Sequence, residues 1–173
     1  MKVRVFLALW PDAAVRESLQ GIAADCHVRC AGRGMRGDTL HMTLAFIGEL
    51  AAARVPEVKA IASGVRVPPF TLTLDRVACW RHNRIAHLYP GEVPVELPHL
   101  VATLVAGLTR EGIPFDRKPS KPHVTLLRHA NCSAVLPEIQ PVRWPVSDFV
   151  LVQSVLRDEG AHYEVLGRWA LVR

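Results

Sequence analysis

One tetrapeptide pattern occurs in each half of the chain, and its residue types suit acid–base chemistry. The first copy spans residues 41–44 (HMTL) and the second spans residues 123–126 (HVTL). Both copies lie in apolar segments that predict β-strands. Because alternate residues of a strand point to the same side, we expect His41 to share a face with Thr43, and His123 with Thr125. The intervening apolar residues would point into a core. The pattern therefore places an imidazole beside a hydroxyl, twice.

Two such pairs are suited to hydrolysis of a phosphodiester. Imidazole titrates near neutral pH, so a neutral ring and a protonated ring can coexist. The neutral ring can take a proton from water, and the protonated ring can give one to the leaving oxygen. The threonine hydroxyls can donate hydrogen bonds to the non-bridging phosphate oxygens and hold the phosphorus in place. Neither motif is flanked by the carboxylates of a magnesium site, so we expect neither a metal nor a cofactor.

Other residues that could do chemistry show no spacing of this kind. The remaining histidines interpreted as background are His82, His87, His99, His129 and His162. The tryptophans are expected in the core or in a cleft wall, and they are Trp10, Trp80, Trp144 and Trp169.

The cysteines do not form a recognisable metal or disulfide pattern. Cys26 and Cys30 would share one face of a helix, but no CxxC or HxxxH supplies the further ligands of a zinc site. Cys79 and Cys132 stand apart. In a cytosolic chain of this length we expect all of them to be buried or idle thiols, with no disulfide framework.

The elements that must position the motifs can be predicted from apolar periodicity. Strands are expected at residues 2–10, 39–47, 70–75, 122–127, 146–156 and 163–172, with 84–88 as a possible partner of 70–75. Helices are expected from residue 11 or 12 onward, within 54–63, and over 97–108. Strands with interspersed helices predict an α+β domain with the helices outside the sheets. We expect residues 1–173 to form a single bilobal domain, with halves at 1–91 and 92–173 and one motif in each.

The composition and the lengths of the apolar runs exclude several classes of protein. Of the 173 residues, 50% are hydrophobic and 21% are charged, which excludes an intrinsically disordered chain. No apolar run approaches the length of a membrane span, and the apolar run near the N-terminus is too short for a signal peptide. We therefore expect a cytoplasmic protein. Its net charge of +5 suits a polyanionic partner such as RNA.

The segments around both motifs resemble a known family. Residues 40–49 (LHMTLAFIGE) and 121–128 (KPHVTLLR) resemble the two motif segments of the 2H phosphoesterase superfamily, named for its paired His-x-Thr/Ser motifs. Residues 4–9, 70–75 and 163–169 resemble other strands of its bacterial RNA 2′,3′-cyclic phosphodiesterase branch, which is LigT-like and was historically called 2′-5′ RNA ligase. The resemblance covers most of the chain.

This resemblance implies a fold and a mechanism. The fold would be bilobal and pseudo-symmetric, with two antiparallel sheets flanking a central cleft. His41 would be the proton donor to the departing ribose 3′-oxygen, and His123 the proton acceptor that activates water. Thr43 and Thr125 would hold the phosphate oxygens. The expected reaction is hydrolysis of an RNA 2′,3′-cyclic phosphodiester end to a 2′-phosphomonoester, with possible reversible 2′-5′ ligation.

Four further residues are candidates for substrate binding. Arg128 and Phe46 each lie five positions after a motif histidine, so regular strand parity would turn both away from the cleft unless the strand ends or bulges. Phe46 could stack on a base, and Arg36 could guide an RNA backbone. Ser154 lies in a late strand where the family often has small polar residues. A solvated role is the alternative for Arg128 and Arg36, and a core role is the alternative for Phe46.

Two alternative functions stay open at this point. A 2H enzyme acting on another cyclic phosphate, such as a cyclic nucleotide or an ADP-ribose cyclic phosphate, would carry the same motifs. A non-catalytic RNA-binding module would fit the charge but would not need two histidines. The expected partner is RNA with 2′,3′-cyclic phosphate or 2′-5′ linked ends, tRNA fragments included, bound by a monomer.

Overall fold

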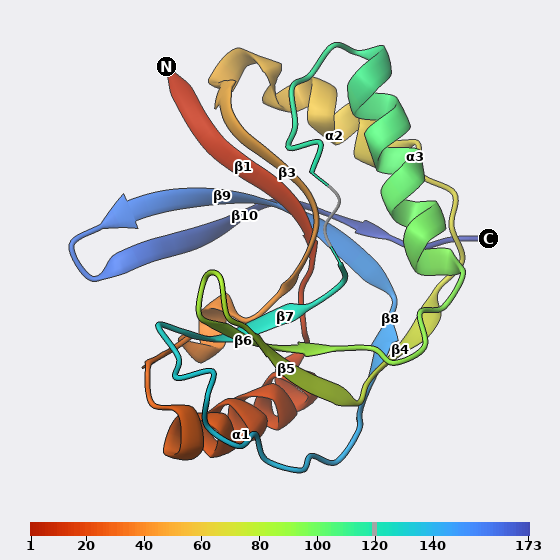
Figure 1. The fold of residues 1–173 in the computed structure, drawn as a ribbon. Coiled ribbons are helices and arrows are strands. Elements are labelled where there is room, and N and C mark those ends of the chain that lie inside the picture. The colour runs from red at the N-terminus through yellow and green to blue at the C-terminus, as the bar shows by residue number, and fades with distance from the viewer. Residues whose placement is uncertain (119–120) are drawn as a thin grey trace.

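Antiparallel strands pair across the whole width of the molecule (Figure 1). The strands are β1 (Lys2–Leu9), β2 (Arg33–Gly34), β3 (Met42–Ala51), β4 (Phe70–Leu74), β5 (Arg76–Trp80), β6 (Ile85–Tyr89), β7 (Val124–Arg128), β8 (Val142–Val146), β9 (Asp148–Arg157) and β10 (Gly160–Ala170). In the computed structural model, which describes residues 1–118 and 121–173, eight of them form one sheet, in the order β10-β9-β1-β3-β7-β6-β5 with β2 paired to β7. β4 and β8 form a separate sheet.

The helices lie outside the sheets, as expected for an α+β protein. They are α1 (Ala13–Cys30), α2 (Val55–Ser63) and α3 (Glu96–Arg110), with short 3₁₀ turns η1 (Gly37–Thr39) and η2 (Ala52–Arg54). α2 and α3 pack on each other, and α1 lies at the opposite end of the molecule (Figure 1). No helix in the described residues combines the length and the apolar character needed to cross a membrane.

α1 follows β1 directly and confirms the helix predicted there. Asp12 caps it, because its carboxylate accepts a hydrogen bond from the Val15 amide at 2.9 Å. Its buried stripe repeats at helical spacing and packs against β7 and β8; it consists of Val15, Leu19, Ile22, Ala23, Cys26 and Cys30. Cys26 and Cys30 are therefore buried free thiols on one helix face, as predicted.

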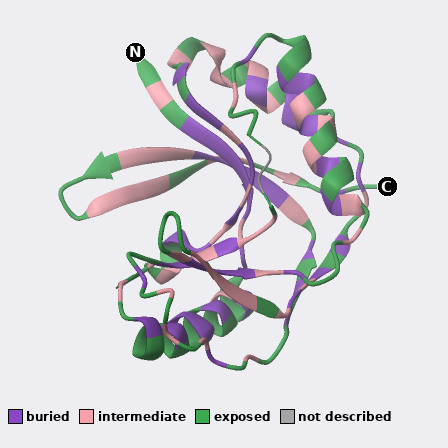
Figure 2. Cartoon of the chain, in the orientation of Figure 1, coloured by how far each residue is buried: buried purple, intermediate pink, exposed green. Residues whose placement is uncertain are grey.

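β1 lies at the centre of the packing. Residues 5–9 are all buried, whereas a strand with one solvated face would alternate (Figure 2). The odd-numbered residues belong to the large core. Phe6 and Ala8 point the other way and form a smaller apolar cluster with Val150 and Val152 of β9. Trp10, Phe46 and Tyr163 pack against this smaller cluster.

Strand pairing differs from the prediction in one respect. Residues 84–88 were a possible partner of 70–75, and this pairing is wrong: β6 pairs with β5 and β7, whereas β4 pairs with β8. β5 and β8 were not predicted as strands. Pairing between segments distant in sequence is set by which apolar faces meet in space, and local alternation does not specify the partner.

The predicted state of two cysteines is also wrong. Cys79 of β5 and Cys132, in the segment after β7, form a disulfide. They are 53 residues apart in sequence, so no short spacing motif marks the pair. β5 and β7 are the two neighbours of β6 in the sheet. This order places the segment after β7 within reach of β5.

Candidate active site

The two tetrapeptide motifs meet where β3 and β7 pair. The pairing residues are Met42 and Val124, and each directly follows a motif histidine. His41 and His123 therefore sit one residue before their strands begin, rather than inside them as predicted. Met42 and Val124 are buried, which confirms that the apolar motif residues anchor the pairs. The junction holds the two histidines on adjoining strands.

All four motif side chains line one cleft. It has a volume of about 850 Å³, and its walls include His41, Thr43, His123 and Thr125. The spacing within each motif predicted that histidine and threonine would share a face, and the structure confirms this. The cleft is large for a single small ion and has the size of typical small-molecule sites.

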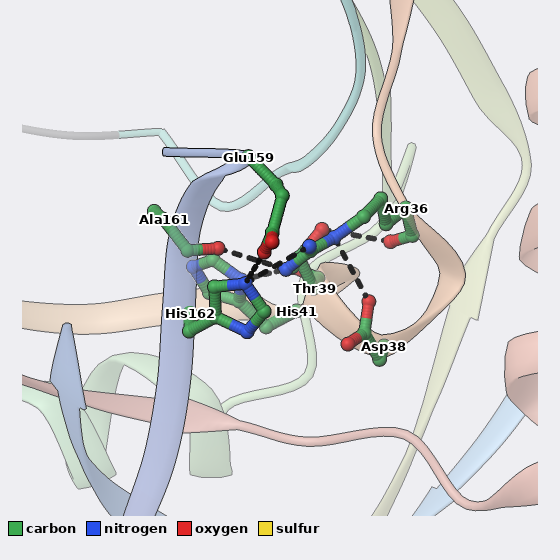
Figure 3. A network of polar contacts seen from close by, with 7 residues as sticks. All are labelled: Arg36, Asp38, Thr39, His41, Glu159, Ala161 and His162. Atoms are coloured by element: carbon green, nitrogen blue, oxygen red, sulfur yellow. Dashed lines mark hydrogen bonds and ion pairs between the residues drawn. The ribbon is translucent and has the colours of Figure 1, made fainter. Parts of the chain in front are cut away.

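Both imidazole rings are anchored in the same way. The Nδ1 atom of His41 lies 2.7 Å from the carbonyl oxygen of Thr39 (Figure 3), and that of His123 lies 2.8 Å from the carbonyl oxygen of Lys121. A carbonyl oxygen accepts only, so each Nδ1 carries the proton and donates it. Nε2 is then the nitrogen free to exchange a proton. In His41 this atom lies 3.1 Å from the Thr43 hydroxyl.

The surroundings of both rings favour the neutral form in the free protein. Burial lowers the pKa of His41 to about 4, against a hydrogen bond to the Thr39 carbonyl that raises it, and His123 and Arg128 lower it further. Burial also lowers the pKa of His123, with Arg128 acting in the same direction. A bound phosphodiester anion would act oppositely, because a nearby negative charge favours the protonated ring.

A β-bulge in β3 turns Phe46 into the cleft. The β1 partners of Thr43 and Ala45 are adjacent residues, so Leu44 is an extra residue in β3. The bulge reverses the parity of the strand after it, and Phe46 lines the same cleft as the motif side chains. The regular parity considered from the sequence would have turned it away.

The second motif carries a bulge at the equivalent position. The β6 partners of Thr125 and Leu127 are adjacent residues, so Leu126 is the extra residue in β7. Arg128, the last residue of β7, consequently lines the cleft. The sequence analysis predicted that Arg128 would reach the cleft only if the strand ended or bulged near this point, and the bulge at Leu126 meets this condition. Phe46 and Arg128 are thus equivalent positions of the two motifs.

Ser154 also lines the cleft, from the neighbouring β9. It pairs with Arg4 of β1 on one side and with Tyr163 of β10 on the other. The guanidinium of Arg4 lies 4.9 Å from the ring centroid of Phe46. Together with Lys2 and Arg128, Arg4 gives the cleft lining a basic character, which suits an anionic ligand.

Arg36 has a different surrounding from the other candidates. Its guanidinium donates a hydrogen bond to the carbonyl oxygen of Ala161 in β10 at 2.8 Å and lies 3.4 Å from the carboxylate of Asp38 (Figure 3). Arg36 therefore joins the segment before His41 to the start of β10. Substrate binding by Arg36 stays a prediction.

Sequence reasoning missed the aromatic neighbours of His41. The ring of Trp10 stacks on it with centroids 5.2 Å apart and an angle of 10° between the planes. Phe6 lies at 4.9 Å, and Tyr163 meets it edge-on at 5.5 Å. Trp10 follows β1 by one residue, so only the pairing of β1 with β3 would have located it.

The neighbours of His123 were missed as well. Trp80 of β5 lies at 4.7 Å from the His123 ring and stacks at 3.7 Å on His87 of β6. His87 is buried 5.7 Å from His123, and burial lowers its pKa. His87, interpreted as background from the sequence, thus lies beside His123 but is not among the residues that line the cleft. The signal that would have found it is the pairing of β6 with β7, which sets His87 opposite Thr125.

The acidic and metal-ligating residues do not gather here. Within residues 1–118 and 121–173, no group of three or more histidine, cysteine, aspartate or glutamate side chains is placed to hold a metal ion. The two motifs offer two imidazoles and two hydroxyls, and the rest of the cleft lining adds basic side chains and the carboxylate of Glu49. These groups can transfer protons and bind an anion.

Comparisons with known proteins find similar sequences and a similar fold. Residues 9–87 match the family model described as LigT like Phosphoesterase. A protein of Escherichia coli (strain K12) named RNA 2′,3′-cyclic phosphodiesterase is 34% identical over 172 residues, covering 98% of this chain and 97% of that protein. One of the same name from Thermus thermophilus is 31% identical, covering 98% and 90%. The crystal structure of E. coli LigT complexed with 3′-AMP superimposes with a TM-score of 0.91 at 33% identity, over 100% of both chains.

Proposed function

The chain belongs to the LigT-like phosphoesterase family, and we propose that it hydrolyses RNA 2′,3′-cyclic phosphodiester ends to 2′-phosphomonoesters. The observation that carries the proposal is the pair of histidines on adjoining strands, each with Nδ1 held by a backbone carbonyl and with its threonine in the same cleft. The names of the full-length relatives support the same substrate class.

The proposed step needs one proton at each ring. His123 Nε2 takes a proton from water as the water oxygen bonds to phosphorus. The bond between phosphorus and the ribose 3′-oxygen breaks, and His41 Nε2 gives its proton to that oxygen. Thr43 and Thr125 donate hydrogen bonds to the non-bridging oxygens, whose negative charge grows in the transition state. His41 ends neutral and His123 ends protonated, and exchange with solvent restores both.

The electrostatics of the cleft explain how the acid acquires its proton. In the free protein the pKa of His41 is about 4, so its ring is neutral near pH 7. A cyclic phosphodiester brings one negative charge into the cleft, which raises the pKa of both histidines. The substrate itself thus promotes the protonated state of the donor. The pH dependence of kcat, which reports the bound complex, is expected to be bell-shaped.

The experiment is incubation with an RNA that ends in a 2′,3′-cyclic phosphate, in EDTA, followed by identification of the product. We expect the 2′-phosphate, and a decrease of about 10²–10⁴-fold in kcat for His41→Ala and for His123→Ala. His99→Ala, an exposed substitution on α3, is the matched control and should keep full activity.

Three outcomes would overturn parts of the proposal. Turnover close to wild type in either motif variant would remove the two-histidine mechanism. Hydrolysis of a cyclic mononucleotide or of an ADP-ribose cyclic phosphate in preference to RNA would reassign the substrate. Binding of RNA ends without any product would favour a binding module.

We also propose that the protein acts as a monomer. All four motif side chains come from one chain and line one cleft, which is consistent with an active monomer. Gel filtration with light scattering at the assay concentration tests this. RNAs with 2′,3′-cyclic phosphate ends, including tRNA fragments, are the substrates to compare. A cytoplasmic location stays a prediction.

A further inference from the structure

Trp10 stacks against one face of the His41 ring. It lies between β1, which ends at Leu9, and Asp12, whose carboxylate caps α1. The angle between its ring plane and that of His41 is 10°, at a centroid distance of 5.2 Å. Trp10 also packs against the small apolar cluster formed by residues of β1 and β9.

Its position separates Trp10 from the substrate. The residues that line the cleft include Phe6, His41 and Tyr163, but among the described residues Trp10 lines a different hollow, next to Asp12 and Arg16. A base or sugar in the cleft would therefore meet the other rings first. Trp10 contacts the cleft through His41, on which it stacks, and through Tyr163, whose ring it meets edge-on at 5.9 Å.

The groups that face His41 mostly disfavour a charge on it. Burial is the largest effect, and His123 before β7 and Arg128 at the end of β7 act in the same direction. Tyr163 approaches from β10 with a ring at 89° to the imidazole. The Thr39 carbonyl favours the charged ring. The face of an indole attracts a cation placed within about 6 Å of its centroid, and the attraction is larger in a desolvated site.

We infer that Trp10 is a positioning residue that stabilises the protonated form of His41 and thereby makes His41, rather than His123, the proton donor. The inference rests on the proposed function. It is motivated by an asymmetry between the two sites: the Trp10 and His41 planes are parallel, whereas Trp80 meets His123 at 75°. Trp80 instead stacks on His87, so an indole face lies parallel to the ring of His41 but not to that of His123, although the backbone anchors of the two histidines are the same.

The test compares Trp10→Leu and Trp10→Phe with Trp80→Leu. In Trp10→Leu the alkaline limb of the kcat–pH profile should move to lower pH by about 0.5–1 unit, because a cation–π contact is lost. Trp10→Phe keeps a smaller aromatic face and should move the limb by less. Trp80→Leu is the matched control: it removes the aromatic neighbour of His123 and should leave the alkaline limb in place.

A second measurement does not need activity. NMR titration of the His41 ring, with inorganic phosphate bound, should show half-protonation about 0.5–1 pH unit lower in Trp10→Leu than in the wild type. An unchanged His41 titration in a folded variant, or a rate that falls equally at every pH, would overturn the inference. Absence of hydrolysis by the wild-type protein would instead overturn the proposed function, and the titration would still decide the role of Trp10.

Discussion

His41 and His123 share an anchor, but each has its own surroundings. A backbone carbonyl two residues earlier fixes Nδ1 in both, which leaves Nε2 to the cleft. His41 is then enclosed by Phe6, Trp10 and Tyr163. Holding a titratable ring among apolar groups favours its neutral form, so the site should lower the stability of the protein in acid.

Titration of His41 should therefore contribute to the pH dependence of the free energy of unfolding. Its pKa is about 4 when folded and about 6.5 when unfolded. Between these values the unfolded chain binds more protons, so the free energy of unfolding falls as the pH falls. Denaturation at pH 7 and pH 4 should show that the wild type loses up to about 3 kcal/mol more than His41→Gln does.

A matched variant separates this effect from the general acid sensitivity of a basic protein. His99→Gln removes a histidine from the exposed surface of α3, and its pH dependence should follow that of the wild type. Parallel curves for His41→Gln and the wild type would contradict the expected cost of the buried ring.

The sequence predicted the motif residues at this scale, but their neighbours could not be predicted from it. The spacing of His41 and Thr43 identifies them as candidates, because His123 and Thr125 repeat it. The stacking of Trp10 on His41 depends instead on how β1 pairs with β3. The bulge at Leu44, which brings Phe46 into the cleft, inserts one residue without any unusual residue type at the site.

At the scale of elements, the contact between α2 and α3 shows packing prevailing over helix propensity. Gly107 lies in the buried face of α3, and a Cβ atom added there would overlap with Ile61 of α2. Ile61 is buried and β-branched, so its χ1 cannot easily change to make room. The glycine permits the close approach of the two helices despite its low helix propensity.

Gly107→Ala should consequently lower the free energy of unfolding by about 1–3 kcal/mol, the usual cost of overpacking. Gly21→Ala in α1 is the control, because a Cβ atom there meets nothing within 4 Å. That substitution should stabilise the protein by roughly 0.5–1 kcal/mol, since alanine is the better helix former. Equal effects of the two variants in urea denaturation would contradict the close packing of α2 on α3.

The elements themselves were predictable to different degrees. The apolar stripes of α1 and α3 repeat within one helix, so the sequence alone places both helices. The pairing of β4 with β8 joins segments far apart in the chain, and alternation in β4 says only that some partner covers it. Local periodicity therefore predicted the helices and most strands, but not the sheet order that assembles the site.

At the scale of the molecule, the cleft lies where two groups of strands join. One group runs in the order β10-β9-β1-β3 and the other in the order β7-β6-β5, so each group combines strands from both halves of the sequence. The pair Met42–Val124 connects them. Repeating one motif in two halves thus places both histidines at the centre of one sheet.

The disulfide of Cys79 and Cys132 should stabilise the group of strands on the His123 side. β5 is an edge strand that pairs with β6, and Trp80, next to Cys79, packs on His87 and His123. Reduction should lower the free energy of unfolding by about 2–4 kcal/mol, mainly by freeing the unfolded chain. Denaturation with and without dithiothreitol measures this, with the double variant Cys79→Ser/Cys132→Ser as the control that should not respond.

Thiol titration of the unfolded, unreduced protein gives an independent check. It should find two reactive thiols, Cys26 and Cys30, rather than the four cysteines of the sequence. Four thiols, or identical stability with and without reductant, would contradict the bond.

Since a cytoplasm keeps most thiols reduced, a cytoplasmic protein must also fold without the disulfide. We therefore expect the reduced protein to keep a cooperative unfolding transition at a lower urea midpoint, because its cores, the helix packing and the β3–β7 junction do not depend on the bond.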